Sequence, residues 1–231
     1  MTLNRDELKR AAALRAIEEV RDGMVVGLGT GSTAAFVVDG LARRVAEGLR
    51  VVGIPTSEQT AAQARRLGIP IATFAEYQQL DLTIDGADEV QLGSLDLIKG
   101  LGGALLREKI VAAASRRLVI VVDQEKLVEQ LGEHTPVPVE VSQFGWQATA
   151  VALAKLGCAP ERRYTAGEQP FVTDGGNYIL DCRFGPIIDP SKLEKSIAMT
   201  VGTVESGLFV GRSSMVVVAS ATGVEVLTPP R

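Results

Sequence analysis

Between Met24 and Val122, short apolar segments typical of β-strands alternate with segments typical of helices, and this alternation restricts the possible folds more than any other feature. The strand-type segments are 24–28, 50–54, 69–72, 80–84, 96–98 and 118–122. A helix to about Val20 precedes them, with Asn4 and Glu7 placed to form a capping box at its start. Because parallel neighbours need a crossover, usually a helix, the order predicts a parallel sheet with helices on both faces.

The pattern changes after residue 130. A proline-studded strand at 135–141, which we expect at a sheet edge, precedes a helix at about 143–156. Strands near 161–164 and 177–184, a helix after Pro190 and a strand near 203–210 complete the order β-α-β-β-α-β. This order is typical of a ferredoxin-like domain. Segments 214–220 and 224–227 predict a hairpin that can rejoin the first sheet.

The sequence therefore predicts an α/β chain with two domains. Residues 1–130, rejoined by 207–231, are expected to form a Rossmann-like parallel-sheet domain that carries the catalytic residues. Residues 131–206 are expected to form a smaller, ferredoxin-like α+β domain. With 231 residues, of which 46% are hydrophobic, the chain is long enough to bury a sizeable core.

Charge and hydropathy exclude several classes of function. The 24 Lys and Arg residues against 28 Asp and Glu give a formal net charge of −4, and no basic patch typical of nucleic-acid binding is visible. No apolar run approaches the roughly 20 residues that span a bilayer. The first seven residues lack the apolar stretch of a signal peptide. We therefore expect a cytoplasmic protein without nucleic-acid or membrane partners.

Few residues are available for histidine or cysteine chemistry. The only histidine is His134, which nearly excludes His-rich metal sites. Cys158 and Cys182 have no CxxC spacing, so we expect buried thiols in a reducing compartment instead of a disulfide or redox pair. Acid–base chemistry must therefore fall mainly to Asp, Glu, Lys or Tyr.

A glycine-rich loop, Gly27–Thr33, lies between a strand and a helix. Its glycines let a ligand approach the backbone, while the helix N-terminus and three hydroxyls offer donors that suit a phosphate. The loop is a poor dinucleotide fingerprint, because Ser32 occupies the last glycine position of GxGxxG. It is not a Walker loop, because no Lys precedes Ser32. The alternative is a plain strand-to-helix turn.

Two further loops are expected at the carboxyl ends of strands, where open α/β sheets bind ligands. Asp85, Asp88 and Glu89 lie within five residues, and their carboxylates suit a polyol, Mg²⁺ or merely a solvated turn. Lys99–Gly103 places a cation at the mouth of a flexible loop that enters a helix, so it either holds an anion or only packs tightly. Lys126 follows another strand and is expected near the same edge.

Glu108 lies on the next helix, inside the charged triplet 107–109. Its neighbours three and four residues away are Ala104, Leu105, Val111 and Ala112. A carboxylate among apolar side chains has a raised pKa and becomes a useful base. Because this helix is apolar nearly all round, an exposed charged triplet is an equally good interpretation.

Six motifs in this order resemble those of the A-type ribose-5-phosphate isomerases. They are Gly29–Thr33, Asp85–Glu89, Ile98–Ala104, Leu106–Lys109, Thr173–Tyr178 and Gly207–Phe209. The resemblance runs from about Asp6 to Leu227. Each motif is weak alone, whereas the ordered combination is highly specific. Small departures are Leu101 and Gly175, where glycine and asparagine are common, and the segment 199–202; none of them touches a charged position.

The resemblance implies reversible interconversion of ribose 5-phosphate and ribulose 5-phosphate, in the non-oxidative pentose phosphate pathway and, in photosynthetic organisms, the Calvin cycle. It implies no metal or organic cofactor, and a homodimer or homotetramer. It also implies that Glu108 is the base, that Lys99 stabilises the enediolate oxygen, and that Asp85 opens the sugar ring and handles hydroxyl protons. The substrate-binding residues that it implies are Thr30, Gly31, Ser32, Thr33, Asp85, Gly86, Ala87, Asp88, Lys99, Gly100, Leu101, Gly102 and Lys126.

Two other classes of protein compete with this interpretation. The first is a non-catalytic sugar-phosphate sensor, but only about 20 residues precede the first strand, too few for a helix-turn-helix module. The second is an enzyme similar to the CoA transferases, which would need a glutamate that forms a thioester. Turnover of ribose 5-phosphate without CoA distinguishes this second class.

Overall fold

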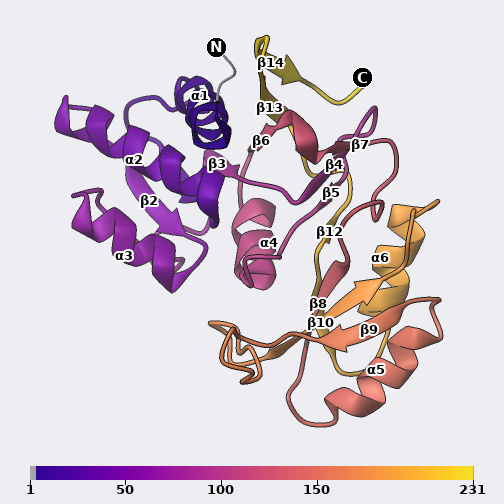
Figure 1. Cartoon of the computed structure of the whole chain (residues 1–231). Helices are drawn as coiled ribbons and strands as arrows, with labels where there is room; N and C mark the ends of the chain where they lie inside the picture. Colours follow the sequence, from indigo (N-terminus) through magenta and orange to yellow (C-terminus); the bar gives the residue numbers. More distant parts are fainter. Residues whose placement is uncertain (1–3, 231) are drawn as a thin grey trace. The chain divides into compact units, whose positions relative to one another are not determined.

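The structure, a computed structural model, describes residues 4–230. Its contacts divide the chain into two compact units (Figure 1). The first contains the chain up to Ala87, Arg107–Leu127 and the chain from Arg212 onward, whereas the second contains Asp88–Leu106 and Val128–Gly211. Among the described residues, no helix is both long and apolar enough to cross a membrane.

A six-stranded sheet forms the centre of the first unit. Its strands, in spatial order, are β14 (Gly223–Leu227), β13 (Met215–Ser220), β6 (Leu118–Asp123), β3 (Leu82–Asp85), β1 (Val25–Leu28) and β2 (Val52–Pro55). The five strands from β13 to β2 are parallel, and β14 pairs antiparallel with β13. The parallel sheet and the C-terminal hairpin that rejoins it are therefore confirmed.

Helices cover both faces of this sheet. They are α1 (Arg5–Ile17), α2 (Ser32–Ala46), α3 (Glu58–Arg66) and α4 (Leu105–Ala113). Alternate residues of a strand face opposite sides, and in β1 Val26 packs in the core with α1 and α2, whereas Val25 packs with Val111 of α4. Helices α1 and α2 lie side by side (Figure 1). The predicted capping box of Asn4 and Glu7 is present at the start of α1.

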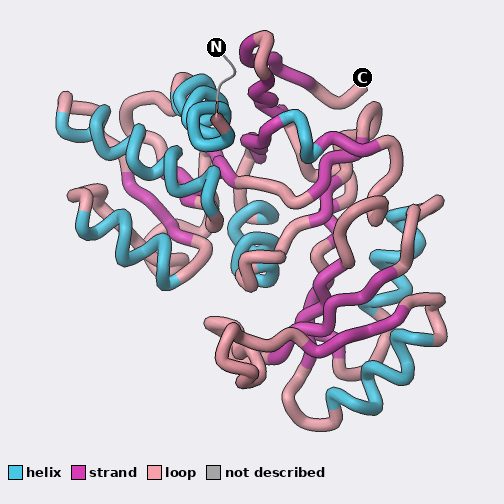
Figure 2. Tube along the Cα trace, viewed as in Figure 1, coloured by secondary structure: helices cyan, strands magenta, loops and turns pink. Residues whose placement is uncertain are grey.

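The second unit contains the predicted β-α-β-β-α-β order. Its elements are β8 (Val137–Val141), α5 (Trp146–Ala154), β9 (Ala159–Arg162), β10 (Tyr178–Arg183), α6 (Pro190–Ala198) and β11 (Thr203–Ser206). The strands form an antiparallel sheet in the order β11-β8-β10-β9. Leu153 of α5 and Ile197 of α6 share one core with β8 and β10, so both helices cover the same face (Figure 2).

The prediction that residues 135–141 form an edge strand is wrong, because β8 lies between β11 and β10. In an antiparallel strand, the N–H and C=O of one residue face the same neighbour. The Pro138 carbonyl faces Gly207, whose N–H donates to it over 2.7 Å. Pairing with β11 ends at Ser206 and Val139, so the missing N–H of Pro138 falls beyond the ladder.

Two of the expected strands in the first half of the chain do not form as predicted. Segment 69–72 is not a full strand and contacts the edge of the large sheet through an isolated parallel bridge between Ile71 and Gly53 of β2. Segment 96–98 forms β5 (Leu97–Ile98), which belongs to a separate sheet and pairs antiparallel with both of its neighbours there. That sheet has the order β12 (Leu208–Phe209), β5, β4 (Glu89–Gln91), β7 (Leu127–Val128). Short apolar segments do not reveal their direction of pairing, which explains the error for 96–98.

Candidate active site

In the first unit, the loop after β1 lies against the end of β3. The Thr30 N–H donates to Asp85 Oδ1 over 3.1 Å, and the Gly29 N–H donates to the Ile84 carbonyl over 3.0 Å. A Cβ at Gly29 would lie 2.2 Å from Asp85 Oδ1 and 2.6 Å from the Asp85 Cα. Glycine is therefore required at position 29 because the two strand ends approach so closely.

A cluster of hydroxyl groups at the end of β2 holds Thr30. Its Oγ1 lies 2.7 Å from Thr56 Oγ1 and 2.9 Å from Ser57 Oγ, while Thr60 Oγ1 donates to the Gly29 carbonyl over 2.9 Å. Thr56, Ser57 and Thr60 are not among the residues predicted from the sequence motifs. The available signal was the density of hydroxyl residues just after the second strand.

The same loop leads into α2, whose N-cap is Gly31 at φ +106°. No side chain caps this helix and its first turn contains no acidic residue. Gly31 and Ser32 are exposed and Thr33 is half-buried. The first N–H groups of a helix have no intrahelical acceptors, so this N-terminus can bind an anion.

Glu108 of α4 is placed at the same sheet edge as Asp85. The Leu80 N–H, before β3, donates to the Ala114 carbonyl at the end of α4, so α4 runs antiparallel to β3 and its start lies toward Asp85. A Cβ on Gly27 would lie 2.6 Å from Val111 Cγ1, which shows that Val111 packs on the sheet. Glu108 is one helical turn before Val111 on the same face. Its side chain is 3% exposed, and Asp85 is equally buried.

The charged triplet therefore divides. Glu108 and Lys109 are both buried, whereas Arg107 is partly exposed and pairs with Glu58 of α3 over 2.9 Å. The interpretation of the whole triplet as exposed is wrong. The packing of α4 determines that two of these three adjacent charged side chains are buried. The sequence could not show which two, because all three have similar apolar neighbours.

Lys126 ends a short 3₁₀ helix, η1 (Gln124–Lys126), that follows β6. Asp123 caps this turn by accepting a hydrogen bond from the Glu125 N–H over 3.1 Å. The half-buried Lys126 thus follows the carboxyl end of β6, next to β3 in the sheet. Lys126 therefore follows the carboxyl end of a sheet strand, and its part in binding a ligand stays a prediction.

Asp88 and the predicted loop residues Lys99, Gly100, Leu101 and Gly102 belong to the second unit. The Leu101 N–H donates to Asp88 Oδ2 over 2.9 Å, and the Asp88 N–H donates to the Ile98 carbonyl over 2.8 Å. Lys99 is buried, its N–H donates to the Gly207 carbonyl over 2.9 Å, and its Nζ lies 5.4 Å from the centre of the Phe209 ring. The structure therefore brings Asp88 and the 99–102 loop together, while Leu101 and Gly102 are exposed. Gly86 and Ala87, which close the first unit, are half-buried.

Glu89 has a different role from the neighbouring aspartates. Its carboxylate accepts three backbone hydrogen bonds, from Gly132 over 2.6 Å, His134 over 2.8 Å and Thr135 over 2.7 Å. The side chain is buried and holds the 132–135 turn. The three-carboxylate cluster suggested by the sequence therefore reduces to Asp85 and Asp88.

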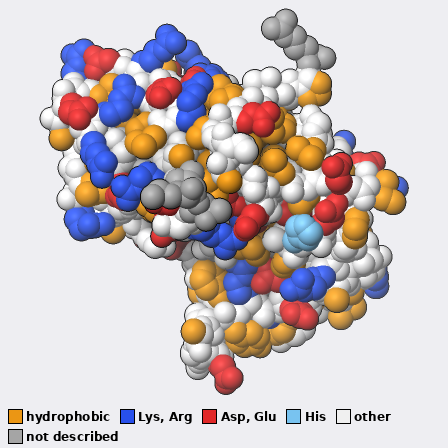
Figure 3. Space-filling view, turned by 45° about the horizontal axis from the view of Figure 1, so that its top comes forward, with side chains coloured by type: hydrophobic (Ala, Val, Ile, Leu, Met, Phe, Trp, Pro, Cys, Tyr) orange, Lys and Arg blue, Asp and Glu red, His pale blue; other side chains and the backbone are white. Residues whose placement is uncertain are grey.

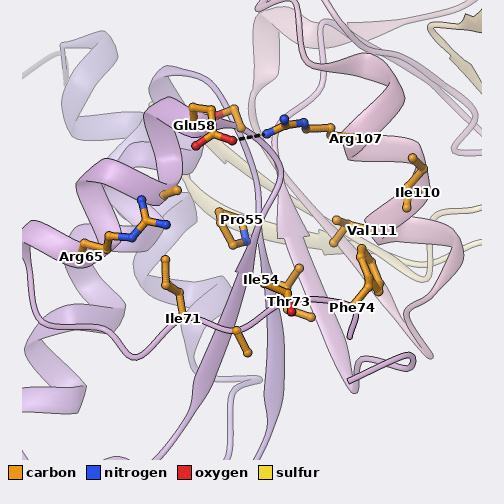
Figure 4. Close-up of a pocket in the computed structure, with 13 residues that line it drawn as sticks. Ile54, Pro55, Glu58, Arg65, Ile71, Thr73, Phe74, Arg107, Ile110 and Val111 are labelled. Atoms are coloured by element: carbon orange, nitrogen blue, oxygen red, sulfur yellow. Dashed lines mark hydrogen bonds and ion pairs between the residues drawn. The ribbon is translucent and has the colours of Figure 1, made fainter. Parts of the chain in front are cut away.

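A pocket of about 410 Å³ opens in the first unit beside α3 and α4. Its floor is apolar, with Ile54 and Val111 among the lining residues, and the ion pair of Glu58 and Arg107 lies at its rim (Figure 4). None of the predicted site residues lines this pocket. On the face drawn in Figure 3, acidic and basic side chains are interspersed, so their charges largely offset one another. An anion would therefore be attracted by the groups that contact it and not by the charge of the whole face.

The comparisons identify the family. Residues 52–223 match the family model for ribose 5-phosphate isomerase A, or phosphoriboisomerase A. The chain belongs to the ribose-5-phosphate isomerase A family. A curated member from Gloeobacter violaceus is 67% identical over 97% of both chains, and one from a Synechococcus strain is 56% identical over 96% of this chain and 97% of its own.

Solved structures of the family share the fold. A ribose 5-phosphate isomerase A from Methanocaldococcus jannaschii is 41% identical, with a TM-score of 0.93 over 96% of this chain and 99% of its own. A D-ribose-5-phosphate isomerase solved in complex with phospho-erythronic acid is 37% identical, with a TM-score of 0.95 over 98% of this chain and 100% of its own. The fold of this chain is therefore that of the ribose-5-phosphate isomerase A family.

Proposed function

We propose that this chain is an aldose–ketose isomerase that interconverts ribose 5-phosphate and ribulose 5-phosphate. Membership of the ribose-5-phosphate isomerase A family supports this reaction. The observation that carries the proposal is the burial of two carboxylates, Asp85 and Glu108, at the carboxyl edge of the parallel sheet. Ligands of open α/β sheets bind at that edge.

The reaction moves a proton between adjacent carbons through an enediolate, so it needs a base at those carbons. We assign this role to Glu108, whose side chain is removed from water on the sheet-facing side of α4. Partial removal from water suits a carboxylate for proton abstraction from carbon, because it loses stabilisation by solvent. Asp85 is assigned to ring opening and to proton transfer at the sugar hydroxyls.

Lys99 is assigned to the enediolate oxygen, because a fixed cation stabilises charge that develops there. The backbone hydrogen bond from Lys99 to Gly207 fixes the main chain, and the Phe209 ring lies beside the buried ammonium. A fixed, buried cation is what this role requires. Asp88 is assigned to orienting the sugar. The proposed reaction uses these side chains alone, without a metal or organic cofactor.

The remaining residues are assigned to binding the substrate. Thr30, Gly31, Ser32 and Thr33 surround the open N-terminus of α2, which suits a phosphate dianion. Lys126 adds a cation after β6. The backbone of Gly86, Ala87, Gly100, Leu101 and Gly102 completes the proposed set.

We further propose a cytoplasmic homodimer or homotetramer that acts in the pentose phosphate pathway, and in the Calvin cycle if its host is photosynthetic. Three side chains of the second unit, Phe144, Met199 and Val201, are exposed by 94%, 84% and 91%. Contact between copies of the chain would remove these apolar side chains from water, which favours self-association. The mass of the protein in solution, against 24.5 kDa for one chain, tests this proposal.

The test of the function is a coupled assay of ribulose 5-phosphate formation from ribose 5-phosphate, without CoA or added metal. We expect turnover by the native protein. Glu108→Gln keeps size and hydrogen bonding but removes basicity, so turnover should fall by about 10²–10⁴, while calorimetry still detects substrate binding.

Arg107→Gln is the matched control, because it alters the adjacent, partly exposed charge and should change turnover little. Absence of turnover in the native protein would reject the proposed reaction. A Glu108→Gln variant as active as the native protein would reject only the assignment of the base.

A further inference from the structure

Arg163 follows β9 and was not among the predicted site residues, yet its side chain contacts the proposed substrate loop. Its Nη1 donates to the Gly100 carbonyl over 2.9 Å and to the Leu101 carbonyl over 3.0 Å. One guanidinium nitrogen thus bridges two consecutive carbonyls of the 99–102 loop. The Gly103 N–H donates to the Gly100 carbonyl over 2.9 Å and closes the turn from within.

The second unit holds this guanidinium in place from several directions. Asp181 of β10 accepts two hydrogen bonds from Arg163, one of them from Nε to Oδ2 over 2.9 Å, so the pair is bidentate. The backbone N–H of Arg163 donates to the Ile179 carbonyl over 2.9 Å, and the Arg163 carbonyl accepts a hydrogen bond from the Phe171 N–H over 3.0 Å. The Arg163 side chain is only 13% exposed. Its backbone and its head group are therefore both fixed.

Phe171 contacts the other end of the same turn. Gly103 has a φ of +84°, and a Cβ there would lie 2.3 Å from Phe171 Cζ. The Arg163 guanidinium lies 5.8 Å from the centre of the Phe171 ring. Arg163 therefore holds the start of the 100–103 turn, and Phe171 packs against its end.

The geometry of the peptide bond shows what this arrangement achieves. In a trans peptide, the C=O and the following N–H point in opposite directions. The Gly100 carbonyl faces Arg163, and the N–H of the same peptide, that of Leu101, donates to Asp88 on the other side. The Leu101 carbonyl also faces Arg163, so the Gly102 N–H points away from the guanidinium. Within residues 4–230, this N–H has no hydrogen-bond acceptor.

We propose that Arg163, oriented by Asp181, is a positioning residue for the isomerase reaction. By holding the Gly100 and Leu101 carbonyls, it turns the Gly102 N–H toward an oxygen of the sugar phosphate and keeps the loop beside Asp88. This inference rests on the proposed function, because it assigns the loop to the substrate. Arg163 itself does not touch the reacting atoms.

The test compares Arg163→Gln and Arg163→Lys with Arg162→Gln. Arg162 is the matched control, because its guanidinium stacks on Trp146 at 4.4 Å and Tyr164 at 4.8 Å and makes no hydrogen bond to the loop. We expect kcat/KM of Arg163→Gln to fall by about 10- to 100-fold through misplacement of the loop. Arg163→Lys, which keeps one donor group and the charge, should lie between it and the native protein. Arg162→Gln should stay within about threefold of the native value.

Hydrogen exchange of the peptide that covers residues 99–104 gives a second reading that does not depend on turnover. Exchange should be faster in Arg163→Gln than in the native protein and unchanged in Arg162→Gln. The positioning role would be overturned if exchange in Arg163→Gln equalled that in the native protein. It would also be overturned if Arg163→Gln and Arg162→Gln lost the same amount of kcat/KM. If the native protein fails to isomerise ribose 5-phosphate, the proposed function fails, and the exchange experiment still decides whether Arg163 holds the loop.

Discussion

Cys158 and Cys182 lie in different surroundings, although the sequence predicts a buried thiol at both positions. Cys182 is buried on β10, whereas Cys158 is half-buried. The hydrogen bond from the Cys182 thiol lowers the pKa of Cys158, with burial opposing this effect. The same hydrogen bond, followed by burial, raises the pKa of Cys182. Of the two thiols, only Cys158 has a lowered pKa, so it forms a thiolate more readily than Cys182.

We predict that iodoacetamide alkylates Cys158 in the native protein and leaves Cys182 unmodified. Because the thiolate is the nucleophile, the rate at Cys158 should rise with pH around a midpoint below that of an ordinary thiol, about 8.5. Mass spectrometry of digests taken across pH 6–9 gives both rates. Equal rates at the two cysteines, or a midpoint at Cys158 above that of a model thiol, would contradict the prediction.

At the scale of elements, Gly27 determines how closely α4 approaches the sheet. A Cβ at this position would lie 2.0 Å from Thr83 Oγ1 and 2.6 Å from Val111 Cγ1. We predict that Gly27→Ala lowers the free energy of unfolding by about 1–3 kcal/mol, the usual cost of overpacking a core. Turnover should also fall, because α4 carries Glu108 one turn before Val111.

Gly167→Ala is the control, since its Cβ would meet nothing nearer than 3.9 Å. Urea unfolding should leave that variant within about 0.5 kcal/mol of the native protein. Similar stability losses for the two variants would show that the contact between β1 and α4 is not the cause.

Helices and strands could be predicted from the sequence where apolar residues recur at a regular spacing or where capping and turn residues mark the ends of an element. The capping box at Asn4 and the order of elements in the second unit depend on local patterns. The position of β8 could not be predicted, because it depends on where its pairing with β11 ends. Local motifs likewise pointed to Asp85 and Glu108. They did not point to Arg163, because the loop carbonyls that it contacts lie 62 and 63 residues away along the chain.

At the scale of the whole molecule, the division into domains 1–130 with 207–231, and 131–206, remains a prediction. The compact units place Asp88–Leu106 with the second unit, so the proposed site residues come from both units. Asp85 and Asp88 are three residues apart in sequence, yet they lie on either side of the division. A single loop therefore connects the carboxylate proposed for proton transfer with the one proposed to orient the sugar.

Acid stability of the whole chain should depend on Glu19, which follows α1 and accepts hydrogen bonds from Arg117 over 3.0 Å and from Arg15 over 3.2 Å. The hydrogen bond from Arg117 is the main cause that lowers the pKa of Glu19. A carboxyl whose pKa is lower in the folded state stabilises that state above its unfolded pKa, about 4.3, and this contribution disappears as the pH falls through the folded value.

We therefore predict that Glu19→Gln is less stable than the native protein by a constant amount at pH 6–8. The difference should shrink below about pH 5, where the native carboxylate begins to lose its advantage. Chemical denaturation across pH 3–8 measures it, with Glu18→Gln as the control, because Glu18 is 68% exposed and its ion pair with Arg15 spans 3.4 Å. A difference for Glu19→Gln that is absent at pH 7, or that stays constant down to pH 3, would show that the Arg117 contact does not stabilise the fold through the charge of Glu19.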